Sequence, residues 1–155
     1  MTLTEIKKRC LEIMKARYPT SKYKYYSNAV VESFTRPCFF TELSVTSSEP
    51  ASTDAERYVG QLSIEILQDV VDEVRALEIA NTLRLAFGRY FMVNAGGGEK
   101  RAVRVNAYDF DFEGTDDNIP VITIDLEWYD SGLLPSETAD IMDGIDVSIK
   151  VETED

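Results

Sequence analysis

The sequence contains no histidine, and this absence narrows the chemistry open to the chain. Histidine is the usual general base near neutral pH and the commonest protein ligand of transition metals. Cysteine is nearly absent too: Cys10 falls on the apolar side of an expected helix, and Cys38 stands among apolar residues with no second ligand or base nearby. Thiols in apolar surroundings have raised pKa values and react poorly. We therefore expect packing roles for both cysteines, no cofactor, no metal and no enzymatic activity.

The sequence also lacks any apolar run approaching the roughly 18 residues of a membrane span. Its N-terminal residues lack the uninterrupted apolar core and the small-residue cleavage site of a signal peptide. We therefore expect no membrane contact and residence in a reducing cytoplasm. That setting argues against a disulfide between the two cysteines.

Positive charge is scarce in this chain. Sixteen Lys and Arg residues stand against 28 Asp and Glu residues, so the formal net charge is −12. An acidic chain is a poor candidate for wrapping nucleic acid, because that binding depends on Lys and Arg at phosphates. Residues 131–155 hold seven acids against one lysine, a net charge of −6 that is half of the total. We therefore expect a more balanced domain over residues 1–130 and an acidic extension over 131–155, either an arm or a partly disordered tail.

The residues that are present suit one globular domain, since 155 residues can bury a core without disulfide or metal. Helical and alternating apolar patterns predict two helices, at 2–17 and 69–91, and five strands, at 22–33, 38–46, 58–66, 103–112 and 122–129. Residues 46–56 are small and polar and predict a loop. The order α-β-β-β-α-β-β predicts an α+β fold with a mostly antiparallel sheet and both helices packed on one face.

Several local patterns sharpen this prediction. Thr2 and Glu5 fit a capping box for the first helix. The apolar alternation of the fourth strand slips in phase after Ala107, which indicates a β-bulge. The stretch AGGGEK (95–100) follows a helix rather than preceding one and lacks phosphate-loop spacing, so it predicts a turn from the second helix into a strand.

The acidic stretch at 109–118 imitates a calcium loop but is better explained as the end of a strand. Asp109, Asp111 and Glu113 occupy the first, third and fifth positions of such a loop. The twelfth position, however, is Pro120 instead of a bidentate glutamate, and the intervening Phe110 is typical of a strand. We therefore expect an acidic strand end with its turn.

The apolar and acidic patterns predict which residues face the core and which face solvent, on the long helix and on the sheet. The core-facing stripe of the long helix is expected to comprise Val70, Val74, Leu77, Ala80, Leu83, Phe87 and Phe91, which leaves Val71, Ile79 and Leu85 outside it. The sheet face opposite the helices is expected to carry Glu42, Glu65, Asp125 and Glu127 as solvated side chains. Pairing of Asp125 and Glu127 with Glu65 for acid–base chemistry is the weaker interpretation.

The chain resembles the tail terminator proteins of bacteriophages and phage-like tail particles (tailocins). The resemblance covers about residues 1–130 and rests on a short amphipathic helix, on RPCFFTELSV (36–45) and ERYVGQLSIEIL (56–67), and on a long helix followed by paired strands. It implies a hexameric ring that ends the tail tube, stops its polymerisation and docks the head or neck connector. The implied partners are further copies of the chain, the tube protein, the connector and, in contractile tails, the sheath protein. The implied location is the virion, after assembly in the host cytoplasm.

Two roles for surface residues follow from this resemblance. Phe40, together with the off-stripe Val71, Ile79 and Leu85, is expected to supply apolar surface for the subunit interface. The acidic face with Glu65, Asp125 and Glu127 is expected to line a channel through which DNA passes without binding. Two alternatives stay open at this point: another neck or head-completion protein, and an acidic module that mimics DNA.

Overall fold

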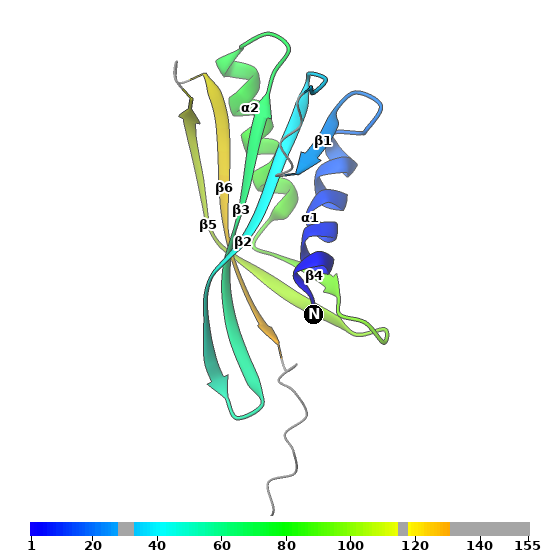
Figure 1. Ribbon diagram of the computed structural model, residues 1–155, viewed down its shortest axis with the longest axis vertical. Helices are drawn as coiled ribbons and strands as arrows, with labels where there is room; N and C mark the ends of the chain where they lie inside the picture. The colour runs from blue at the N-terminus through cyan, green and yellow to red at the C-terminus, as the bar shows by residue number, and fades with distance from the viewer. Residues whose placement is uncertain (28–32, 115–117, 131–155) are drawn as a thin grey trace, which may run out of the picture.

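The computed structural model describes residues 1–27, 33–114 and 118–130. In these residues it contains two helices, α1 (Leu3–Arg17) and α2 (Glu73–Phe87). The strands are β1 (Lys24–Ser27), β2 (Cys38–Ser52), β3 (Ala55–Leu67), β4 (Tyr90–Asn94), β5 (Lys100–Glu113) and β6 (Ile119–Asp130). They form one sheet in the order β1-β2-β3-β6-β5-β4, in which only the β1–β2 pair is parallel. The expected α+β fold with a mostly antiparallel sheet is confirmed (Figure 1).

The core lies between the two helices and one face of the sheet. Helix α1 contributes Ile6, Cys10 and Met14, and α2 contributes Ile79, Leu83 and Phe87. The facing sheet residues are Phe39, Leu62, Ile64, Ile122, Ile124, Leu126, Trp128, Phe91, Val93 and Val103. Both helices therefore cover the same face, as expected, and the other face of the sheet remains open.

The first helix begins as its sequence predicts. The Thr2 hydroxyl accepts a hydrogen bond from the Glu5 N–H at 3.2 Å, and the Glu5 carboxylate accepts one from the Thr2 N–H at 2.7 Å. This reciprocal capping box satisfies two N–H groups that a helix start leaves unpaired. The bond from the Thr2 backbone lowers the pKa of Glu5.

Both cysteines are free and buried, as expected for packing residues. Cys10 lies in the core on α1, and burial raises the pKa of its thiol to about 12. Cys38 opens β2 and is 1% exposed, and burial raises the pKa of this thiol as well. A thiol that keeps its proton is a poor nucleophile and a poor metal ligand.

The second helix is shorter than predicted, and a strand follows it. Helix α2 ends at Phe87 because Gly88 adopts φ 63°, a conformation that favours glycine. Residues 90–94 then form β4, in which Phe91 and Val93 are buried and their neighbours are exposed. The prediction of one helix over 69–91 was wrong because Phe91 continues the apolar spacing of α2 by coincidence. AGGGEK accordingly joins β4 to β5, not a helix to a strand.

The polar stretch at 46–56 is a hairpin, so the predicted loop was wrong. Strand β2 runs to Ser52 and β3 begins at Ala55, and the two remain paired up to Ser52 and Ala55. Figure 1 shows this hairpin extending well beyond the helices at the lower end of the molecule. Every residue from Ser44 to Asp54 is exposed, so pairing occurs there without burial and leaves no apolar periodicity to detect.

The bulge predicted in β5 is confirmed, because the register of β5 against β6 shifts between Val105 and Ala107. Asp109, Asp111 and Glu113 lie within β5, as the strand interpretation requires. No group of three or more His, Cys, Asp or Glu side chains in the described residues is arranged to hold a metal ion. No helix among them is long and apolar enough to cross a membrane. The predicted 131–155 extension lies outside the described residues.

Candidate assembly surfaces

Helix α2 carries a second apolar stripe that points away from the core. Val74, Leu77 and Leu85, here called the outer stripe, lie on the side of α2 opposite the buried Ala76, Leu83 and Phe87. Val74 and Leu85 are 65% and 66% exposed. An exposed apolar stripe of this kind, on a helix that already has a buried face, is typical of a protein–protein interface.

The apolar surface continues before the helix, where Val70 and Val71 are also exposed. The backbone there is held by the buried side chain of Gln68, whose amide donates to the Asp72 carbonyl at 3.0 Å and accepts from the Asp72 N–H at 3.1 Å. Asp72 in turn caps α2 by accepting from the N–H groups of Val74 and Arg75. The loop is therefore closed by hydrogen bonds and presents both valines to solvent.

These positions correct the predicted orientation of α2. Ile79 was expected outside the core-facing stripe, but it is 3% exposed in the core and cannot supply an interface. Val70, Val74 and Leu77 were expected in the core and are exposed instead. The predicted exposure of Val71 and Leu85 is confirmed. Helical spacing identified two apolar stripes but could not say which one faced the sheet.

Phe40 belongs to an aromatic patch on the opposite side of the subunit. Its ring stacks on Tyr26 with centroids 5.3 Å apart and meets Phe34 edge-on at 5.6 Å. Phe34 is 39% exposed and Phe40 is half-buried. Phe40 pairs with Glu65 across β2 and β3, so this aromatic patch (Tyr26, Phe34 and Phe40) lies on the open face of the sheet, away from α2.

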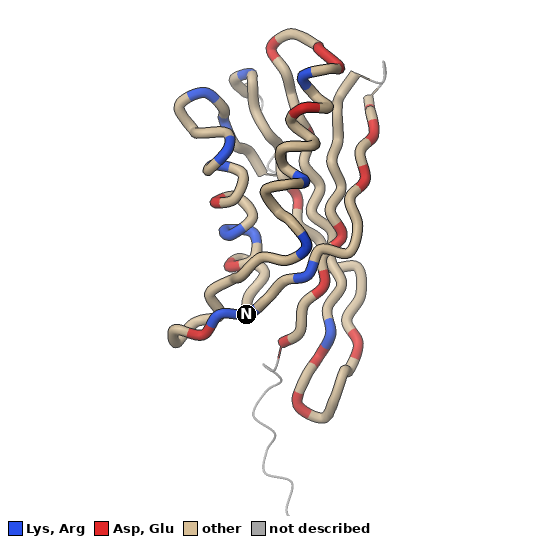
Figure 2. The backbone as a smooth tube through the Cα atoms, turned by 180° about the vertical axis from the view of Figure 1, so that it is seen from behind, with Lys and Arg blue, Asp and Glu red and all other residues tan. Residues whose placement is uncertain are grey.

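The open face is strongly acidic. The strand registers place these carboxylates on it: Glu42, Glu65, Asp109, Asp111, Asp125 and Glu127. The predicted placement of Glu42, Glu65, Asp125 and Glu127 on one face is therefore confirmed. Figure 2 shows acidic positions recurring along the strands, whereas α1 carries most of its charges as Lys and Arg.

Glu127 does not behave as a solvated carboxylate on this face. It is 8% exposed and accepts hydrogen bonds from Arg57 Nη2 at 2.8 Å, Asn106 Nδ2 at 3.0 Å and Tyr129 Oη at 3.3 Å. The bond from Arg57, followed by that from Asn106, lowers the pKa of Glu127 to about 2. The expectation of a solvated side chain was wrong at this position, because its cross-strand neighbours bury and neutralise it.

Glu65 and Asp125 have different surroundings from Glu127. Asp125 accepts a hydrogen bond from Gln61 Nε2 at 3.1 Å and forms none of the described salt bridges. Partial burial, reinforced by Glu113 and Glu42, raises the pKa of Glu65. Of the three carboxylates predicted to line a channel, Glu127 forms a described salt bridge, whereas Glu65 and Asp125 form none among the described residues.

Glu127→Gln is expected to destabilise the fold by about 2 kcal/mol at neutral pH, because hydrogen bonds to a charged group contribute roughly that much. The native pKa near 2 lies below the ordinary value of 4.5, so this stabilisation is present above pH 4.5 and disappears as the pH falls towards 2. Urea unfolding at several pH values would measure it. Glu65→Gln is the matched control and should stabilise the fold at neutral pH, since its carboxyl resists ionisation. Equal effects from both variants would contradict this electrostatic account.

Comparison with known proteins identifies the family. Residues 5–137 match the family described as phage tail terminator protein. No curated protein matches the chain in sequence. Among solved structures 22 chains match. One of them has a TM-score of 0.51 and 23% identity, over 82% of this chain and 90% of its own, which shows a likeness of fold alone. Because the family match spans most of the sequence, the chain belongs to the phage tail terminator family and is a structural component of a phage tail.

Proposed function

We propose that the protein forms a closed ring, of six subunits, on the last ring of the tail tube. The ring stops tube polymerisation and presents the surface on which the head or neck connector docks. It works through shape and surface contacts, with no catalytic step and no cofactor. Assembly takes place in the host cytoplasm, and in a contractile tail the same ring meets the end of the sheath.

The observation that carries this proposal is the placement of two apolar surfaces on opposite sides of one subunit. The outer stripe of α2 points away from the helix-covered face, and the aromatic patch around Phe40 lies on the open face. A ring needs heterologous contacts, in which one surface of a subunit binds a different surface of the next. A twofold dimer would instead need one self-complementary surface. The arrangement therefore favours a ring, with Val71, Leu85 and Phe40 in the subunit contacts.

The projecting hairpin supports contact with a neighbouring ring of the tail. Its residues Ser44–Asp54 are exposed and extend past the body of the subunit (Figure 1). The small polar side chains near its tip suit hydrogen bonding to the tube protein. The connector then binds at the other end of the ring.

The acidic open face fits the wall of the channel. Glu65 and Asp125 contribute negative charge there. Glu127 accepts a hydrogen bond from Arg57 and stabilises the pairing of the strands that form the wall. Like charge repels DNA phosphates, so the genome passes without adhering.

Deletion of the gene, with complementation, tests this function. Particles without the protein should have overlong tails, and the wild-type protein should restore uniform length. A variant with Glu65→Lys and Asp125→Lys should also restore length but slow DNA exit. Normal tails without heads would instead indicate another neck protein, and a monomer that competes with DNA for a basic partner would indicate a DNA mimic. Either result would overturn the proposal, and unchanged DNA exit would overturn the channel assignment.

A further inference from the structure

A basic and partly apolar groove runs along one side of α1. It has a volume of about 560 Å³. Its walls are Leu3, Thr4, Lys7, Lys8, Leu11, Glu12 and Lys15 from α1 and Leu43 from β2. Three lysines against one glutamate make it a site of positive charge on an acidic protein. Neither the core nor the two apolar surfaces proposed for the ring include this groove.

The groove lies beside an edge of the sheet. Strand β1 pairs with β2 only from Cys38 to Thr41, and no described strand covers that edge from Glu42 onward. An uncovered edge presents unpaired N–H and C=O groups that can accept an added strand. Leu43, in the part of β2 that no described strand pairs on this side, lines the groove. An added strand would therefore place alternate side chains against Leu43 and α1.

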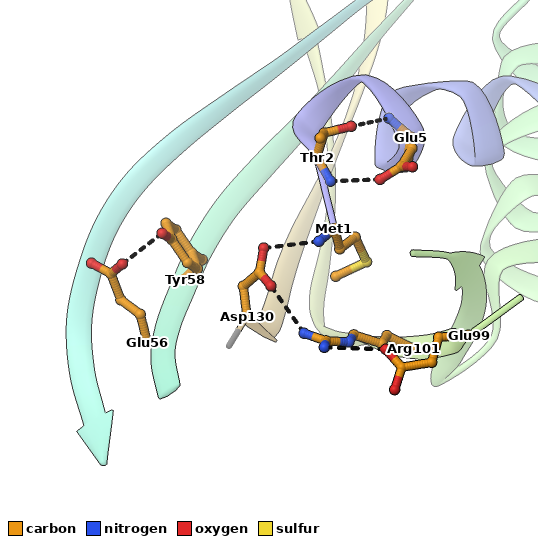
Figure 3. Close-up of polar contacts among 8 residues, drawn as sticks. All are labelled: Met1, Thr2, Glu5, Glu56, Tyr58, Glu99, Arg101 and Asp130. Atoms are coloured by element: carbon orange, nitrogen blue, oxygen red, sulfur yellow. Dashed lines mark hydrogen bonds and ion pairs between the residues drawn. The ribbon is translucent and has the colours of Figure 1, made fainter. Parts of the chain in front are cut away.

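The last described residue, Asp130, lies at the N-terminal end of α1. Its carboxylate contacts the Met1 nitrogen at 2.9 Å and the Arg101 guanidinium at 2.9 Å (Figure 3). The sequence that follows Asp130 thus starts close to Leu3, where the groove begins. The groove spans α1 from Leu3 to Lys15, about 18 Å at 1.5 Å per residue.

The sequence after Asp130 complements this groove in its apolar pattern and in its charge. Ile145, Val147, Ile149 and Val151 alternate with polar residues, and a strand over those seven residues spans about 20 Å. The net charge of −6 over residues 131–155 complements the lysines of the groove. Residues 131–144, at about 3.3 Å per residue, can reach any point along it.

We propose that residues 145–151 of each subunit bind in the α1–β2 groove of the same subunit, as a strand along the uncovered edge of β2. The four alternating aliphatic side chains pack on Leu11 and Leu43, and the acidic residues at the two ends of the strand, Asp143 and Glu152, approach the lysines of α1. The segment thereby covers an edge that could otherwise pair with a foreign strand. This interaction lies within one subunit and does not depend on ring formation.

Hydrogen exchange of the full-length chain tests the proposal. The amides of β2 residues 42–48 that point away from β3 should exchange slowly in the wild type and about tenfold or more faster in Val147→Asp, which removes the proposed apolar contact. Ser148→Asp adds the same charge on the other side of the strand and is the matched control, which should retain slow exchange. Unfolding midpoints should be measured alongside, to show that the domain is folded in both variants.

A pair of introduced cysteines, Leu11→Cys with Val147→Cys, separates binding within a subunit from exchange between subunits. Oxidation should give a disulfide within single chains if the segment binds its own subunit. Native Cys10 and Cys38 should not compete for the new cysteines, because both are buried. Linked dimers would overturn the proposal in favour of a neighbouring subunit's segment. Fast exchange at residues 42–48 in the wild type, or equal loss of protection in Ser148→Asp, would overturn it altogether. Ring formation, measured separately by mass, can fail without affecting either result.

Discussion

Replacing Val74 and Leu85 together by aspartate is expected to leave the subunit folded and to abolish ring formation. Both side chains are about two thirds exposed on α2, so the isolated subunit tolerates a charge at either position. In a ring contact the same carboxylates would be buried without partners, which costs several kcal/mol. A loss of about 4 kcal/mol corresponds to a thousandfold weaker association.

Light scattering or native mass measurement would show this change as a shift from ring to single subunits. Ala16→Asp is the matched control, since Ala16 is exposed on α1 and lies outside the outer stripe. This control variant should form rings as the wild type does. Rings that persist after the double replacement would show that the outer stripe is not the subunit contact, and the ring would then need another apolar surface.

Gly60→Ala is expected to destabilise the fold by about 3 kcal/mol, although Gly→Ala in an unstrained strand is normally favourable. A Cβ atom at Gly60 would lie 2.7 Å from the Ser44 carbonyl oxygen and 2.9 Å from the Trp128 ring. Neither neighbour can move freely, because Ser44 belongs to the adjoining strand and Trp128 is buried and stacked on Tyr58. Relief requires that β2 separate from β3 and that the Trp128 ring on β6 shift.

Thermal unfolding should show the change as a fall of about 10 °C in the midpoint, at 2–4 °C per kcal/mol for a chain of this size. Ser63→Ala, on the open face of the same strand, should stay within about 0.5 kcal/mol of the wild type. An unchanged midpoint for Gly60→Ala would mean that β2 and the Trp128 ring both move aside without cost at this point. The hairpin would then be loosely attached to the body.

The sequence predicted those parts of the fold in which pattern and burial coincide. Helix α1 combines a capping box with a single apolar stripe, so its start and its buried side could both be inferred. The alternation of β3 and β6 likewise placed Glu65 and Asp125 on the open face. Strand β4 was missed because Phe91 and Val93 follow the end of α2 without a break in apolar spacing. The only local signal was Gly88, which ends the helix.

The assembly surfaces were only partly predictable. Two apolar stripes on α2 are visible in the sequence, but choosing between them requires the position of the sheet. The environment of Glu127 depends on Arg57, which is 70 positions away in the chain and reaches it only through the pairing of β3 with β6. Aligning the two strands by their apolar alternation could have suggested this pair. The contribution of Asn106 depends on the bulge in β5, whose exact place no local pattern defines.

The composition of the β2–β3 hairpin has a consequence for the proposed role of the protein in ending tube growth. Long bare strands invite sideways stacking of identical chains into fibres. Here the tip carries serines, charged Glu49 and Pro50, and a proline has no N–H to offer a stacking neighbour. The hairpin can thus contact a partner protein without promoting the side-by-side association of identical chains, an association that would work against the proposed role.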